Sequence, residues 1–172
     1  MKRKLSIVLI IAALYLFISP PTTAEAEQRQ HDEIAIEDII AYTDEIGTRY
    51  NICPEIIQAV IERESHYNPD ATNGDCVGLM QVSEKWHTER MERLGVTDLY
   101  EPYSNILVGT DYLAELWRET SSKGYGDDLY YVLMRYNMIA DSANRLYQDE
   151  GYSEYAISIA ERSAELEREH GK

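Results

Sequence analysis

The chain has 172 residues, of which 31 are acidic and 16 are basic, and its formal net charge is −15. A protein this acidic is repelled by phosphate backbones and anionic lipid surfaces, which argues against nucleic acid as a partner. The plainest interpretation of the charge is solubility, and the length is that of one small domain.

Residues 1–26 have the pattern of a secretion signal. Three basic residues follow Met1, a mostly apolar run extends from Leu5 to Ile18, and a small-x-small cleavage site ends at Ala26. A membrane-spanning helix needs about 20 residues, and this run is shorter. Its length therefore favours cleavage near Ala26 over retention as an N-terminal anchor. We therefore predict an exported protein of the extracellular space, cell wall or periplasm, without an integral membrane domain after cleavage.

The remainder of the chain is expected to be one mainly helical domain. A polar tether covers residues 27–34, and the domain covers residues 35–172. Alternating strand patterns are nearly absent, so we expect at most a small β-hairpin near residues 74–82. Ser83 and Ser104 are candidate capping residues for two of the helices. Helical periodicity or capping signals place helices near residues 35–50, 54–66, 83–95, 104–117, 128–136, 141–148 and 153–167.

The most informative helix is the one that begins at Pro54, because it carries a glutamate on its apolar face. Ile57, Val60, Ile61 and Glu64 lie at i, i+3, i+4 and i+7. Burial disfavours the ionised form of a carboxylate and raises its pKa, which is what a general acid needs near neutral pH. Periodicity alone also allows a helix-end glutamate that turns back to solvent.

Two cysteines, Cys53 and Cys76, are the only ones in the chain. In an exported protein an even pair is interpreted first as a disulfide, and we predict a Cys53–Cys76 bridge. The alternative is a pair of free buried thiols. Since Cys-x-x-Cys and His-Glu-x-x-His motifs are absent and the four histidines are scattered, we expect no metal and no cofactor.

Four segments occur in a characteristic order along the chain. The segments are Glu64-Ser65 with Asn68-Pro69-x-Ala71, then Gly78-Leu79-Met80-Gln81-Val82, then Pro102-x-x-Asn105-Ile106-x-x-Gly109-x-x-Tyr112-Leu113, and finally Tyr136-Asn137. Together they resemble the catalytic domain of soluble lytic transglycosylases, which are relatives of goose-type lysozyme in the lysozyme-like group. The similarity extends over roughly residues 36–160.

The resemblance implies a lysozyme-like fold that cleaves the β-1,4 bond between N-acetylmuramic acid and N-acetylglucosamine in peptidoglycan glycan strands, with a 1,6-anhydro product. Glu64 matches the single catalytic acid/base of the family. The resemblance also implies the substrate-binding residues: Ser65, Asn73, Met80, Gln81, Tyr136 and Asn137. Asn105 is expected to order a helix start.

The sequence departs from the family at Arg135, where a small residue is usual, and at Ile139, where glycine is common. Two alternatives stay open. A hydrolytic goose-type muramidase would carry an aspartate at Ser83, so Asp70 or Asp75 would have to supply its second carboxylate. A non-catalytic wall-binding or assembly protein would keep the fold without the chemistry. The size of the domain also fits local wall opening for a larger cell-envelope apparatus.

Overall fold

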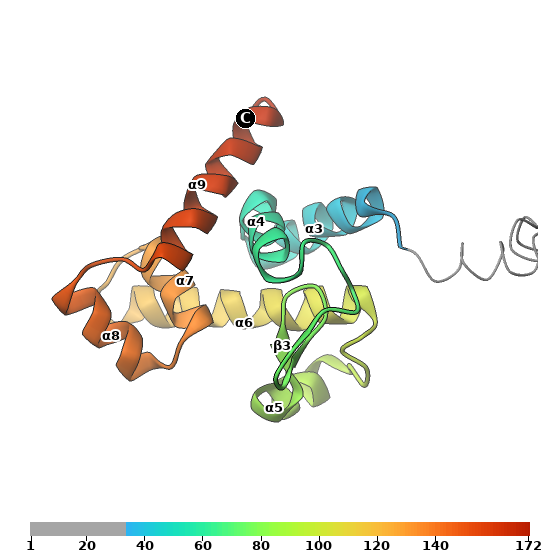
Figure 1. Ribbon diagram of the computed structural model, residues 1–172, viewed down its shortest axis with the longest axis horizontal. Helices are drawn as coiled ribbons and strands as arrows, with labels where there is room; N and C mark the ends of the chain where they lie inside the picture. Colours follow the sequence, from blue (N-terminus) through green and yellow to red (C-terminus); the bar gives the residue numbers. More distant parts are fainter. Residues whose placement is uncertain (1–33) are drawn as a thin grey trace, which may run out of the picture. The chain divides into compact units, whose positions relative to one another are not determined.

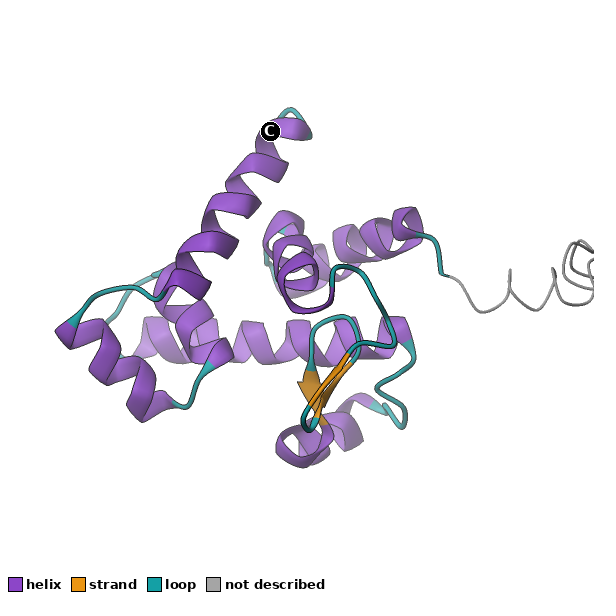
Figure 2. Ribbon diagram, in the orientation of Figure 1, coloured by secondary structure: helices purple, strands orange, loops and turns teal. Residues whose placement is uncertain are grey.

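The structure is a computed structural model that describes residues 34–172, so the predicted signal and nearly all of the tether lie outside the described residues. The domain begins at Ala35. Helices dominate it, and one small sheet lies beside them (Figures 1 and 2). The elements are α3 Ile36–Tyr50, α4 Pro54–Ser65, β1 Thr72–Asn73, β2 Cys76–Val77, β3 Val82–Ser83, α5 Glu84–Leu94, α6 Pro102–Ser122, α7 Leu129–Asn137, α8 Ala140–Asp149 and α9 Glu154–Glu169.

Helix α4 lies at the centre of the packing, between α3 and α9, while α6 packs against both α3 and α7. Its predicted apolar stripe is confirmed, because Ile57, Val60 and Ile61 are all fully buried. Burying each such side chain stabilises the fold by about 1.5–3 kcal/mol. The long-range contacts of α4 therefore fix the position of the helix end that carries Glu64.

The sheet has three strands in the order β1-β2-β3, all antiparallel. It extends the predicted hairpin by one strand, since Cys76 pairs with Asn73 on one side and with Ser83 on the other. The segment Gly78 to Gln81 is the tight connection between β2 and β3. Such a connection needs left-handed backbone, and Gly78 has φ +76°.

The helices begin close to the predicted residues, but two residues that were predicted to cap a helix do not do so. Asp128 caps α7 through Tyr131 N–H, at the start that was predicted for that helix. Ser104 does not cap α6, because that helix begins two residues earlier at Pro102 and Glu101 accepts hydrogen bonds from its first N–H groups. Ser83 precedes α5, but its hydroxyl makes no capping hydrogen bond. Pro102 is well suited to the first helical position, which explains the earlier start.

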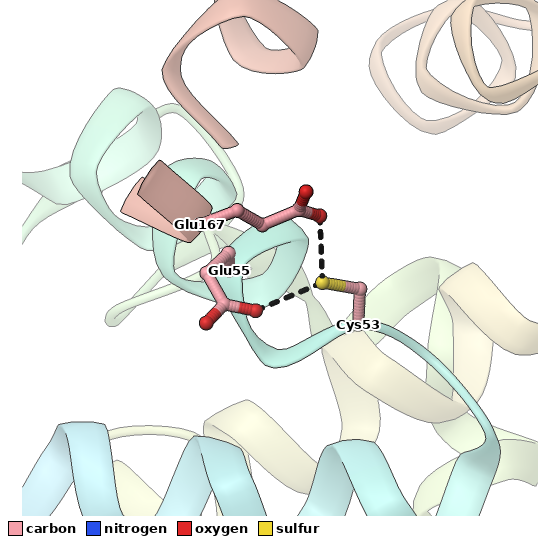
Figure 3. Close-up of side chains that lie close together, drawn as sticks. All are labelled: Cys53, Glu55 and Glu167. Atoms are coloured by element: carbon pink, nitrogen blue, oxygen red, sulfur yellow. Dashed lines mark hydrogen bonds between the residues drawn. The ribbon is translucent and has the colours of Figure 1, made fainter. Parts of the chain in front are cut away.

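The predicted Cys53–Cys76 disulfide is wrong, because both thiols are free. Cys53 lies at the start of α4, whereas Cys76 lies in β2, near the opposite end of that helix. The loop after α4 turns into the sheet and does not return along the helix. The Cys53 Sγ instead donates to Glu55 Oε2 at 2.8 Å and to Glu167 Oε1 at 3.2 Å. Figure 3 shows both glutamate side chains beside the thiol.

We expect the denatured protein to titrate two thiols and its melting temperature to be unaffected by reductant. Burial and the hydrogen bonds to Glu55 and Glu167 raise the pKa of Cys53 to about 12, so its thiol should also react slowly in the native state. Alkylation with iodoacetamide before and after unfolding, followed by mass spectrometry, measures both properties. Unmodified cysteines in the denatured, unreduced protein would contradict the free-thiol assignment.

No helix in the described part of the chain is long and apolar enough to cross a membrane.

Candidate active site

Glu64 is the second-last residue of α4, immediately before a left-handed turn. His66 and Tyr67 have φ +52° and +62°, so the chain reverses sharply behind the glutamate and leads into the sheet. The Glu64 side chain is half-buried. Burial raises its pKa, while the hydroxyl of Tyr155 and the charge of Arg63 act in the opposite direction. The net effect is a raised pKa, which is the property expected of a general acid.

The direct partner of Glu64 is Tyr155, which comes from the first turn of α9. The Tyr155 hydroxyl donates a hydrogen bond to Glu64 Oε1. Burial and the adjacent Glu64 carboxylate hold the pKa of Tyr155 well above its ordinary value, so the phenol keeps its proton. This contact joins residues that are 91 positions apart. No local pattern in the sequence indicated it.

Asn105 holds the Gly78–Gln81 connection in place through hydrogen bonds of its side chain. It is fully buried, and its amide donates to the carbonyl oxygens of Val77 and Leu99, both at 2.8 Å. Its carbonyl oxygen accepts from Met80 N–H at 2.8 Å. A Cβ on Gly78 would lie 2.2 Å from the Asn105 amide nitrogen, so glycine is needed for this approach. The expected ordering role of Asn105 thus extends to the connection between the strands.

Met80 and Gln81 follow on the same connection but differ in exposure. The Met80 side chain is fully buried against Gly109, where a Cβ would lie 2.6 Å from its sulfur. The sulfur of Met80 accepts a hydrogen bond from the Thr110 hydroxyl at 3.9 Å, and its carbonyl accepts one from the Tyr136 hydroxyl at 2.9 Å. Gln81 lies in the wall of a cleft, and its side-chain amide donates to Ala71 and Gly78 carbonyls.

That cleft has a volume of about 440 Å³. Glu64 does not line it, but Cys76 and Tyr136 do, and both are close to Glu64. Burial raises the pKa of each of these two groups, and the charge of Glu64 raises it further. Gln81, Ser83 and Asn137 also line it. Tyr112, from the third family segment, lines it as well, and further lining residues that the sequence analysis did not single out are Trp86, His87, Arg90, Glu115 and Met138.

The other predicted site residues are placed as follows. Ser65 is buried and its hydroxyl donates to Ile61 O of its own helix at 3.0 Å, not to Glu64. Asn73 is exposed in β1, and Asn137 is the exposed last residue of α7.

The two departures from the family differ in their position. Arg135 pairs with Glu119 at 3.0 Å, whereas Ile139 is 71% exposed and lines the cleft.

Within residues 34–172, one group of three side chains could hold a metal ion, namely Cys53, Glu55 and Glu167, whose ligand atoms lie within 4.8 Å of one another. It is at the other end of α4 from Glu64. Glu55 already accepts hydrogen bonds from Lys172 at 2.6 Å and contacts His170 at 2.8 Å. The group is part of the docking of the C-terminus onto α4 and is remote from the cleft.

Tyr155→Phe is expected to raise the pKa of Glu64 further, because it removes a donor that stabilises the carboxylate. An acid that must be protonated loses activity as the pH rises through its pKa. The alkaline limb of the pH–rate profile should therefore move to higher pH in the variant. Cleavage rates on sacculi across a pH series measure this, and an unchanged or lower alkaline limb would contradict the assigned contact. Tyr152→Phe, on the exposed loop before α9, is the control.

A small helical domain with a minor sheet, and with a half-buried glutamate at the end of its central helix close to a cleft, defines a lysozyme-like domain. The family described as "Transglycosylase SLT domain" matches residues 41–158, and the chain belongs to this family.

Several proteins are similar to the chain over part of their length. It is 35% identical over 99 residues to a transglycosylase of Enterobacteria phage PRD1, covering 57% of this chain and 34% of that one. It is 29% identical over 105 residues to the membrane-bound lytic murein transglycosylase E of Buchnera aphidicola, covering 56% of this chain and 46% of that one. The chain thus spans less than half the length of these relatives.

The fold is similar to that of lytic transglycosylase Slt from Pseudomonas aeruginosa, solved as an inactive mutant. The TM-score is 0.63 at 18% sequence identity, and the match covers 76% of this chain and 24% of that one. At this identity the likeness concerns the fold, and it agrees with the lysozyme-like architecture predicted from the sequence.

Proposed function

We propose that the protein is a peptidoglycan lytic transglycosylase that cleaves the bond between N-acetylmuramic acid and N-acetylglucosamine and leaves a 1,6-anhydro ring. The observation that carries the proposal is the half-buried Glu64 with a raised pKa, close to Cys76 and Tyr136 in the wall of the cleft. Membership in the transglycosylase family and the names of the relatives support the same reaction.

In this reaction Glu64 acts first as an acid and then as a base. Its protonated carboxyl donates a proton to the glycosidic oxygen as the C1–O bond breaks, and the acetamido group of the substrate stabilises the positive charge at C1. The Glu64 carboxylate then takes the proton of the C6 hydroxyl, whose oxygen bonds to C1. This returns Glu64 to its protonated form, and no water is consumed. Substrate assistance makes this an exception to the two-carboxylate rule.

The proposed role of the cleft is to hold the glycan strand beside Glu64. Gln81 is proposed to contact acetamido or hydroxyl groups, and Asn137 to lie at the opposite wall. For Tyr136, the bond to Met80 O favours an indirect role, since it joins α7 to the connection between the strands. Ser65 and Met80 are buried and fit a supporting role, and Asn73 is proposed as an outlying contact.

Mass spectrometry of sacculi digested by the purified protein tests the reaction. Transglycosylation releases muropeptides that end in anhydromuramic acid, which are one water lighter than the products of hydrolysis. Reducing-end muramic acid would favour a hydrolytic muramidase. Absence of any product would favour a wall-binding or assembly protein.

The hydrolytic alternative depends on a second carboxylate, and Glu115 is the acidic side chain among the described residues that line the cleft. Its Oε2 lies 3.0 Å from Arg90 Nη2, so it forms an ion pair and is poorly placed to activate water. We expect Glu115→Gln to keep activity within about threefold, since surface-accessible ion pairs contribute about 0–1 kcal/mol. A loss of 100-fold or more in the digestion assay would instead favour hydrolysis with Glu115 as base.

We further propose that the protein acts outside the cytoplasm, after cleavage of residues 1–26 near Ala26. The support is the charge and hydropathy pattern of the first residues and the names of relatives described as membrane-bound. Mass spectrometry of the protein isolated from its host gives the mature N-terminus directly. Co-purification from envelope fractions tests the proposal that it serves a larger apparatus.

A further inference from the structure

Trp86, in the first turn of α5, is the feature of the cleft that the proposed reaction does not use. It is 74% exposed, although a buried aromatic side chain stabilises a fold more than almost any other. It lines the same cleft as Gln81 and Tyr136. A large aromatic side chain left exposed at the wall of a cleft points to a ligand that covers it.

The position of Trp86 relative to Glu64 follows from a series of neighbouring rings. Tyr136 lies at the Glu64 end, and its ring centroid is 5.4 Å from that of Tyr112. Tyr112 in turn is 4.6 Å from the ring of His87. Trp86 is adjacent to His87 in α5, and among the described residues its ring makes no contact with the rings of Tyr112 or Tyr136. A sugar on Trp86 is therefore inferred to lie beyond the two sugars at the bond that is cleaved.

A second observation comes from Ser83, three residues before Trp86 in the same wall of the cleft. Its side chain is 4% exposed, and within residues 34–172 its hydroxyl has no hydrogen-bond partner. A buried hydroxyl without a partner is costly, by about 1–3 kcal/mol. A pyranose needs a flat apolar surface for its C–H face and a hydrogen-bonding group for its polar edge. The Trp86 indole and the Ser83 hydroxyl supply these two groups.

The charges around this part of the cleft favour an uncharged sugar over the charged stem peptide. Arg90 is neutralised by Asp111 and Glu115, both of which it contacts directly. Lys85 lies 5.3 Å from the Trp86 ring centroid and lines a surface hollow together with Asp75 and Glu84. The two cations are thus outnumbered by the four neighbouring carboxylates, so this wall carries no excess of positive charge to attract an anionic peptide.

We propose that Trp86 and Ser83 form a distal sugar-binding site that holds a pyranose ring of the glycan strand away from the scissile bond. Ring stacking by Trp86 supplies affinity, and the Ser83 hydroxyl orients the ring. The enzyme should then bind long glycan strands more tightly than short ones. The inference rests on the proposed function for the identity of the bound polymer, a glycan strand. Its first test measures binding and does not involve cleavage.

The first test is binding of chitohexaose and chitobiose to the Glu64→Gln protein. We expect chitohexaose to shift the tryptophan emission to shorter wavelength and to protect it from acrylamide, because Trp86 becomes covered. Trp86→Phe should remove the shift, while Trp117→Phe should keep it, since Trp117 does not line the cleft. Trp86→Ala should weaken chitohexaose binding about three- to tenfold and change chitobiose binding less than twofold.

Two further variants sharpen the test. Ser83→Ala should also weaken chitohexaose binding, whereas Tyr100→Ala, which removes another exposed ring outside the cleft, should not. Unchanged chitohexaose affinity in Trp86→Ala would overturn the proposal, as would equal losses for both sugars. Because Trp86 is exposed, its replacement should leave the fold intact, and the melting temperature verifies this.

The second test compares the active protein and its Trp86→Ala variant on intact sacculi and on glycan strands stripped of peptide by an amidase. We expect the variant to be slower on both. A defect that disappears on stripped strands would assign Trp86 to the stem peptide and overturn the sugar site. If the active protein releases no anhydro product, the proposed reaction fails, while the binding result still decides the sugar site.

Discussion

Glu64→Gln is expected to reduce the release of anhydromuropeptides by about 10³-fold or more. The amide cannot donate a proton to the glycosidic oxygen or accept one from the C6 hydroxyl, so both halves of the proposed reaction are lost, and general acid–base catalysis contributes typically 10²–10⁴-fold. The variant should fold normally, since glutamine has nearly the same shape and can still accept the hydrogen bond from Tyr155. Initial rates on sacculi measure the effect.

Glu62→Gln is the matched control for this prediction. Glu62 lies on the same turn of α4, but it pairs with Arg162 at 2.9 Å and lines a different surface hollow, together with Arg162. Its replacement should change the rate less than twofold. If Glu64→Gln retained a tenth of the activity, or if both variants were equally impaired, Glu64 would not be the acid/base.

Asn105→Ala is expected to destabilise the domain by about 3–5 kcal/mol. Three buried backbone groups would lose their partner, namely Met80 N–H and the carbonyl oxygens of Val77 and Leu99. Each buried polar group left unsatisfied costs about 1–3 kcal/mol, and partial relaxation offsets part of the sum. The melting temperature should fall by roughly 10–15 °C.

Asn73→Ala is the control for stability, because Asn73 is exposed in β1 and its loss should cost less than about 0.5 kcal/mol. Asn105→Asp separates the two functions of the amide, since it keeps an acceptor for Met80 N–H and loses the donors. It should remain destabilised. A melting temperature of Asn105→Ala within a few degrees of the parent would show that the connection between β2 and β3 is held by other contacts.

The sequence predicted the helices well because their signals are local. The stripe of Ile57, Val60 and Ile61 repeats at helical spacing, and all three are fully buried as a core face should be. A capping residue such as Asp128 acts within one helical turn, so the start of α7 could also be predicted from the neighbouring sequence. Glu64 could be singled out for the same reason, since its place relative to the stripe depends on helix geometry alone.

The remaining features depend on contacts between distant segments. Tyr155 reaches Glu64 only because α9 packs on α4, and nothing near either residue indicates that contact. The disulfide prediction failed for a related reason. Chain length allowed the loop after Glu64 to return to Cys53, but strand pairing with Asn73 and Ser83 keeps Cys76 in the sheet.

Because Tyr155 comes from the last helix, its hydrogen bond to Glu64 forms late, after the other parts of the site are present. A chain that emerges from the ribosome or the export machinery with its N-terminus first presents α4 and the sheet long before α9 follows. Until α9 docks, Glu64 lacks both its hydroxyl partner and part of the protein that shields it from water. Glu64, the proposed acid/base, therefore acquires its final environment only when nearly the whole domain has been delivered, which would couple the proposed activity to complete folding.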